Sequence, residues 1–204
     1  MYIKICGLQT ADTVAAAVGA GADAIGFIFS PGSPRTITAE LAAELGRTVP
    51  VGVETVGVFR NQPMDEVLEI ARKAAVTTVQ LHGDESLADM ASVHAAGFKA
   101  LRAFSADAYN SLSHDEKRDW ESERILLDAV EPGAGVTFDA AVLTDGTPNG
   151  FWLLAGGLNP ANVAAAASAM KPAGVDVSSG VESSRGIKDE QLIRDFILAA
   201  QTNS

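Results

Sequence analysis

The chain has 204 residues, of which 47% are hydrophobic and 20% are charged, so it can bury a sizeable core and is not disordered. Its formal net charge of −11 disfavours nucleic acid as a partner, because nucleic-acid binders carry a basic face. The single cysteine excludes an internal disulfide and a thiolate metal cluster.

Neither the apolar runs nor the N-terminal sequence indicates a membrane or secretory protein. No apolar run approaches the roughly 18 residues that a membrane-spanning helix needs. The N-terminus lacks a basic region followed by a long apolar stretch, which a secretory signal would require. A lone cysteine also fits a reducing compartment. We therefore expect a cytoplasmic protein with no membrane partner.

Short apolar runs, typical of strands, alternate with helix-like segments along the whole chain. The first round pairs Tyr2–Cys6 with an alanine-rich segment that begins at Ala11. The later strand-like runs are 24–29, 55–59, 78–82, 99–104, 124–129, 151–155 and 175–178. The later helix-like segments are one from 38, then 64–75, 87–96, a charged segment through 119, a short one around 138–143, 160–170 and 188–200.

This alternation predicts a (β/α)8 barrel, the TIM barrel, formed by residues 1–204 as a single domain. The strand-like runs are continuously apolar, as in a parallel sheet that is covered on both faces. A doubly wound open sheet is the alternative. It fits less well because such sheets usually have fewer strands, and because no GxGxxG turn follows the first strand-like run.

Two candidates for acid–base chemistry stand at predicted strand ends, where such barrels carry their active sites. Cys6 ends the first run, and Asp128 follows the apolar residues of the sixth. A thiolate is a capable base when positive charge or backbone dipoles lower its pKa, and burial can raise the pKa of a carboxyl group. The alternatives are a small buried hydrophobe for Cys6 and a turn-capping residue for Asp128.

Three further polar residues lie close to strand ends. Lys4 precedes Cys6 on the same strand face, one layer deeper, where a buried lysine would pair with a strand carboxylate. Arg35 lies in a loop, and its guanidinium is either solvated or a clamp for a carboxylate. His82 is either a base or a structural histidine. The other two histidines fall in polar helix-like segments, and the three lack the spacing of metal ligands, so we expect no metal.

The loops after the seventh and eighth strand-like runs are rich in small residues. The first contains Gly156 and Gly157, and the second contains Ser178, Ser179 and Gly180. Small residues let backbone N–H groups approach an anion, and barrels often bind phosphate in these two loops. The alternative is a pair of tight turns that need glycine for backbone reasons alone.

Nine short motifs follow one another along the whole chain in the order found in one enzyme family. They are KICG at 4–7, GADAIGFIF at 21–29, SPR at 33–35, VGVF at 56–59, VQLHG at 79–83, LLDA at 126–129, TFD at 137–139, GGLNP at 156–160 and VDVSSGVE at 175–182. Together they resemble the phosphoribosylanthranilate isomerases of tryptophan biosynthesis. The resemblance implies a (β/α)8 barrel without cofactor or metal. It also implies an Amadori rearrangement of N-(5'-phosphoribosyl)anthranilate to 1-(2-carboxyphenylamino)-1-deoxyribulose 5-phosphate.

The resemblance also implies roles for individual residues. Cys6 would be the general base and Asp128 the general acid. Arg35 would hold the anthranilate carboxylate, while His82 and Asp176 would contact the substrate, Asp176 near the ribose. The backbone amides of the two loops rich in small residues would bind the phosphate. Relatives are commonly monomers or dimers, so we expect a monomer or homodimer whose ligand is this phosphosugar.

The sequence departs from the family pattern at several positions and leaves two alternative functions. Ala134, Ala140 and Thr36 stand where relatives often have larger or hydroxylated residues, which affects the expected packing of the anthranilate. One alternative is the bifunctional isomerase shared by histidine and tryptophan synthesis, but that family uses an aspartate as base where this chain has Cys6. The other is a non-catalytic anion-binding barrel, which the presence of both Cys6 and Asp128 opposes.

Overall fold

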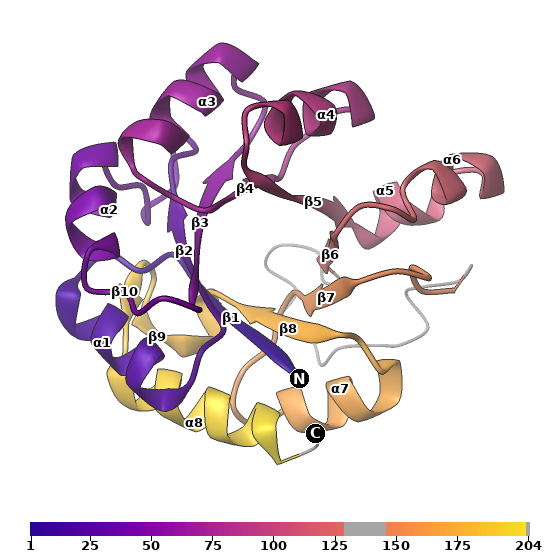
Figure 1. The fold of residues 1–204 in the computed structure, drawn as a ribbon. Coiled ribbons are helices and arrows are strands. Elements are labelled where there is room, and N and C mark those ends of the chain that lie inside the picture. Colours follow the sequence, from indigo (N-terminus) through magenta and orange to yellow (C-terminus); the bar gives the residue numbers. More distant parts are fainter. Residues whose placement is uncertain (129–145, 203–204) are drawn as a thin grey trace.

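The computed structural model describes residues 1–128 and 146–202. Eight parallel strands pair in sequence order, and β1 also pairs with β8, so they close into a barrel (Figure 1). The strands are β1 Tyr2–Cys6, β2 Ala24–Ile28, β3 Glu54–Phe59, β4 Thr78–Leu81, β5 Lys99–Ser105, β6 Ile125–Asp128, β7 Trp152–Ala155 and β8 Gly174–Val177. The closed order confirms the predicted (β/α)8 barrel and excludes an open sheet.

Helices surround the barrel on its outer face (Figure 1). They are α1 Ala11–Ala20, α2 Ala39–Gly46, α3 Met64–Lys73, α4 Leu87–Ala95, α5 Ala106–Asn110, α6 His114–Asp119, α7 Val163–Met170 and α8 Glu190–Gln201. Side-chain oxygens of Thr10, Thr38 and Ser86 accept backbone N–H groups in the first turns of α1, α2 and α4. Each such cap stabilises a helix by about 1 kcal/mol. Among the described residues, no helix is long and apolar enough to cross a membrane.

The segment expected around 138–143 lies outside the described residues, as do the TFD motif and the departures at Ala134 and Ala140. Helix α7 begins at Val163 and not at Pro160 as expected. The reason is a turn in which the N–H of Asn159 donates to Oδ1 of Asn162, which holds the preceding residues outside the helix.

The last helix also begins later than predicted. Asp189 is the N-cap of α8, and its side chain accepts two N–H groups of the first turn, so the helix cannot include Lys188 as expected. Instead, the chain before it forms an unpredicted antiparallel hairpin of β9 Glu182–Ser184 and β10 Ile187–Lys188. This hairpin brings Lys188 back to the C-terminal end of the barrel.

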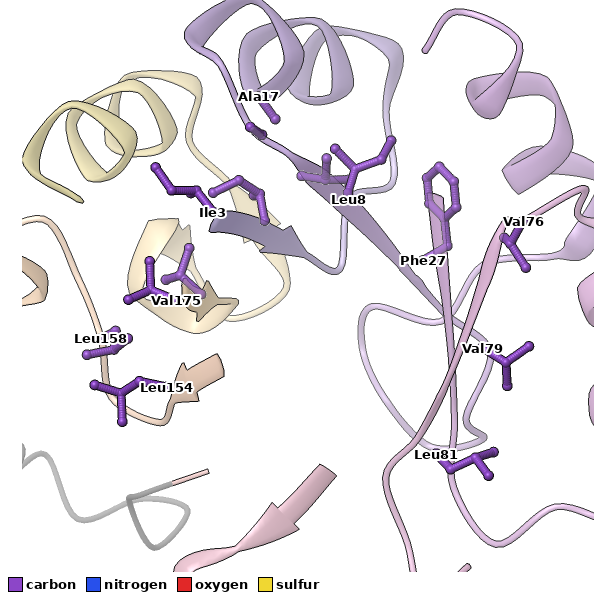
Figure 2. Packing of buried hydrophobic residues seen from close by; sticks show 14 of the residues in the cluster. Ile3, Leu8, Ala17, Phe27, Val76, Val79, Leu81, Leu154, Leu158 and Val175 are labelled. Atoms are coloured by element: carbon purple, nitrogen blue, oxygen red, sulfur yellow. The ribbon is translucent and has the colours of Figure 1, made fainter. Parts of the chain in front are cut away.

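Alternation along each strand separates two packing layers. Ile3, Phe27, Val79, Leu154 and Val175 are at most 1% exposed and point outward into the layer between the strands and the helices (Figure 2). Burying a side chain of this size contributes about 1.5–3 kcal/mol. Strand residues of the opposite parity point into the barrel, and the polar residues at its C-terminal end belong to this inward set.

Candidate active site

Neighbouring strands β1 and β8 bring three titratable groups together. Lys4 pairs in register with Asp176, and the Nζ atom of Lys4 lies 2.6 Å from Oδ1 of Asp176. The expected pairing of Lys4 with a strand carboxylate is therefore confirmed. Cys6 lies one layer closer to the mouth of the barrel and is 5% exposed. Its neighbour in register on β2 is Gly26, where a Cβ atom would lie 2.9 Å from Sγ, so glycine leaves room for the thiol.

The charges around Cys6 oppose one another. Burial raises the pKa of the Cys6 thiol above its ordinary value, and the carboxylate of Asp176 raises it further, whereas the cations of Lys4 and Lys188 lower it. Burial dominates, so Cys6 rests as a neutral thiol at neutral pH. A thiolate base would need a lowered pKa, but in the resting site the pKa of Cys6 is raised.

His82, the residue directly after β4, and Asp128, the last residue of β6, face one another. The Nε2 atom of His82 is 3.9 Å from Oδ2 of Asp128, and each side chain is about one-third exposed at 37% and 34%. Loss of hydration lowers the pKa of His82 to about 4, although Asp176 opposes the shift. The imidazole is therefore neutral at neutral pH. Its Nδ1 atom lies 3.1 Å from Nε2 of Gln80, so the side chain of Gln80 fixes the orientation of the ring.

Arg35 is held by a carboxylate of the hairpin that follows β8. Its Nε and Nη2 atoms donate to Oε1 and Oε2 of Glu182 at 2.5 and 2.8 Å. Lys188 on β10 donates to Oε1 of Glu182 at 2.8 Å and to the carbonyl oxygen of Ser178 at 2.8 Å. Burial alone would raise the pKa of Glu182, but the hydrogen bonds from both cations lower it to about 2.

Glu182 and Lys188 are absent from the set of site residues predicted from the sequence. Glu182 ends the VDVSSGVE motif without an assigned role, and Lys188 falls in the predicted last helix. The turn residues SSRG at 183–186 are a signal for the hairpin that connects them, because glycine and serine cluster at tight turns. Gly186 indeed has a φ of +85° at this turn.

The loops after β7 and β8 lie side by side. A Cβ atom on Gly180 would overlap the carbonyl oxygen of Leu158, so this approach requires glycine. Gly156 and Gly157 adopt φ values of +92° and +61°, which also favour glycine. Among the described residues, none accepts a hydrogen bond from the N–H of Gly157, Ser179 or Gly180. Binding of a phosphate by these amides stays a prediction.

Other polar groups lie apart from this set. Arg102 on β5 points outward, where its guanidinium donates to the carbonyl oxygens of Gly83 and Glu85 and ties down the loop after β4. A cavity of about 380 Å³ opens between α1 and α8 on the outer face and contains none of the candidate residues. Among the described residues, no group of three or more His, Cys, Asp or Glu side chains could hold a metal ion.

Comparisons with known proteins point to one family. The family model for N-(5'-phosphoribosyl)anthranilate (PRA) isomerase matches residues 3–199. An N-(5'-phosphoribosyl)anthranilate isomerase from Deinococcus radiodurans is 40% identical over 201 residues, which cover 98% of this chain and 96% of the relative. The crystal structure of TrpF from Jonesia denitrificans matches with a TM-score of 0.86 and 42% identity over 100% of this chain and 98% of that chain.

A third match was solved with a ligand. It is a phosphoribosyl anthranilate isomerase in complex with reduced 1-(o-carboxyphenylamino)-1-deoxyribulose 5-phosphate. It matches with a TM-score of 0.84 and 34% identity over 99% of both chains. Nearly the whole length of this chain therefore has a counterpart in these proteins.

Proposed function

The chain belongs to the N-(5'-phosphoribosyl)anthranilate isomerase family, and we propose that it performs the Amadori rearrangement of N-(5'-phosphoribosyl)anthranilate in tryptophan biosynthesis. In this proposal, Cys6 is the general base and Asp128 is the general acid. One observation carries this assignment of roles. Cys6 and Asp128 end strands β1 and β6 of one closed barrel, so the thiol and the carboxyl group stand at the same C-terminal end.

Asp128 acts first. It donates a proton to the ring oxygen of the ribose while the bond between that oxygen and C1 breaks. The nitrogen lone pair of the anthranilate amine forms a double bond to C1, which leaves an open-chain iminium ion. His82 lies beside the acid and is neutral at neutral pH, so it adds no positive charge next to the forming cation.

Cys6 acts second, in its thiolate form, after its proton has passed to solvent. The thiolate removes the proton from C2, and the electron pair of that C–H bond forms a C1–C2 double bond as the iminium becomes an amine. The enolamine then tautomerises to the ketone. A cationic iminium beside Cys6 favours the thiolate and offsets the effect of burial on the resting thiol. Proton transfers of this kind contribute about 10²–10⁴-fold each.

The two anionic ends of the substrate match two cationic or amide-rich parts of the site. Arg35 would hold the anthranilate carboxylate, and Asp176, whose Oδ1 is held by Lys4, would line the ribose. The phosphate would bind the amide-rich loops, which contain Gly156, Gly157, Ser178, Ser179 and Gly180. The reaction as drawn needs no cofactor and no metal, and residues 1–204 act as one catalytic domain.

A turnover assay tests this proposal. N-(5'-phosphoribosyl)anthranilate is generated in situ from anthranilate and phosphoribosyl pyrophosphate, and the loss of its fluorescence is followed with the parent protein and with Asp128→Asn. We expect loss above the spontaneous rate with the parent only. No loss with a folded parent would refute the isomerase, and equal loss with both proteins would remove Asp128 as the acid.

A further inference from the structure

Glu182 has a full set of donors on its two carboxylate oxygens. Arg35 donates twice, Lys188 donates once at 2.8 Å, and the N–H of Gly186 donates to Oε2 at 2.9 Å. The Glu182 and Lys188 side chains are only 4% and 2% exposed, whereas Arg35 is 18% exposed. Glu182 therefore fixes the orientation of a guanidinium that still reaches the solvent-facing side of the site.

The fork that Arg35 makes with Glu182 uses one edge of its guanidinium. The Nε and Nη2 atoms belong to that edge. Among the described residues, none accepts a hydrogen bond from Nη1 of Arg35. A planar guanidinium that is locked on one edge presents its other N–H groups in a fixed direction, which suits a second carboxylate.

Lys188 connects the same carboxylate to the loop after β8. Its Nζ atom donates to the carbonyl oxygen of Ser178 at 2.8 Å and lies 3.2 Å from Oγ of that serine. Ser178 directly precedes the amides of Ser179 and Gly180, which have no acceptor among the described residues. The hairpin therefore joins the Arg35 guanidinium and the amide-rich loop through a single buried carboxylate.

We propose that Glu182 and Lys188 are positioning residues that hold the carboxylate clamp and the phosphate loop as one unit, and so select substrates that carry a carboxylate and a phosphate at opposite ends. This inference rests on the proposed function. The cluster contains two cations and one carboxylate, so it keeps one excess positive charge for an incoming anion. Because the cluster is largely buried, that charge is only weakly screened by solvent.

The test measures how much the ligand carboxylate contributes to binding. The probes are reduced 1-(o-carboxyphenylamino)-1-deoxyribulose 5-phosphate and the matching phenylamino compound without the carboxyl group. The dissociation constant of the compound without the carboxyl group, divided by that of the carboxylated probe, reports the carboxylate contact alone. Calorimetry measures both constants. The variants are Glu182→Gln and Lys188→Met, with Lys73→Met as the control, because Lys73 is a 58% exposed lysine of α3 that carries the same charge.

We expect both site variants to lower this ratio by about tenfold, since hydrogen bonds to charged groups are worth that much, and the control to leave it unchanged. The KM should rise more than kcat falls. If the dissociation constants of both probes rose by the same factor, Glu182 and Lys188 would have a structural role only, and the proposal would be overturned. A higher ratio in Glu182→Gln would do the same, because it would show that Glu182 competes with the ligand for Arg35.

Two further observations keep the test decisive. If the variants do not fold, the structure of the parent with the carboxylated probe decides. Arg35 should keep both bonds to Glu182 while the ligand carboxylate contacts Nη1, and displacement of Glu182 by the ligand would contradict the inference. If the parent binds the probe and the folded variants have the same ratio as the parent, the positioning role alone is refuted. A folded parent without turnover refutes the isomerase.

Discussion

Lys4 and Asp176 form an ion pair in the barrel interior, directly beneath the Cys6 thiol, with 2.6 Å between Nζ and Oδ1. The Lys4 side chain is wholly buried and that of Asp176 is 10% exposed. Although burial alone would lower it, the charge of Asp176 and the hydrogen bond to its carboxylate raise the pKa of Lys4, so the lysine stays protonated. A fixed cation therefore lies beside Cys6 at neutral pH.

Removing Lys4 should destabilise the barrel strongly. Lys4→Met leaves Asp176 as a buried charge without its cation, and breaking a buried pair in this way costs about 3–5 kcal/mol. The free energy of unfolding in urea measures the loss. The matched control is the double variant Lys4→Met with Asp176→Leu, in which no charge is left behind, and it should recover most of the loss. A single variant as stable as the parent would show that the pair contributes little.

Replacing the thiol should separate chemistry from binding. In Cys6→Ser we expect kcat to fall about 10²–10⁴-fold, because a hydroxyl is a far weaker base than a thiolate. The dissociation constant of the reduced product analogue should stay within a few-fold of the parent value. Steady-state kinetics and calorimetry measure the two quantities, and a variant with near-normal kcat would rule out Cys6 as the base.

The close contact between the two anion-binding loops predicts an effect of one methyl group. In Gly180→Ala the new Cβ atom overlaps the carbonyl oxygen of Leu158, so the loops must separate and their amides lose alignment. We expect the KM for N-(5'-phosphoribosyl)anthranilate to rise about tenfold or more, and the affinity for inorganic phosphate to fall in parallel, since each lost hydrogen bond to a charged group costs about 1.5–3 kcal/mol.

The control for this substitution is another glycine with space around it. Gly19 lies in α1, and a Cβ atom at this position would have no neighbouring atom within 4 Å, so Gly19→Ala should leave the KM unchanged. Because alanine favours a helix interior, it should also stabilise the fold by up to about 1 kcal/mol. An unchanged KM in Gly180→Ala would show that the two loops do not bind the phosphate as a pair.

The barrel, and the positions of Cys6 and Asp128 at its C-terminal end, could be predicted from the sequence because both depend on local patterns. Apolar runs recur with helix-like segments between them. All strands of such a barrel are parallel, so their C-terminal ends lie on the same side. Cys6 and Asp128 end such runs, so their location at the same end of the barrel needed no knowledge of side-chain packing. The pairing of Lys4 with a carboxylate was likewise expected from strand alternation alone.

The remainder of the site depends on contacts that no local pattern encodes. Arg35 and Glu182 are 147 positions apart, and nothing near either residue indicates that they pair. The two-residue strand that contains Lys188 is too short to show any periodicity. The pKa of Cys6 rises because the packed barrel removes water from the thiol, and that burial exists only once the strands have closed.

The neutral state of His82 predicts a loss of stability in acid. An unfolded histidine takes up a proton near pH 6.5, whereas burial lowers the pKa of His82 to about 4 in the folded protein. Between these values the unfolded state binds more protons, so the free energy of unfolding should fall as the pH drops from about 6.5 to about 4. Glu182, with its pKa lowered to about 2, adds a further loss of stability below about pH 4.5.

In His82→Asn the loss of stability between about pH 6.5 and pH 4.5 should be smaller, while the loss below about pH 4.5 persists. Urea unfolding from pH 7 to pH 3 measures both, and equal slopes in parent and variant above pH 4.5 would show that His82 is not held neutral by the fold.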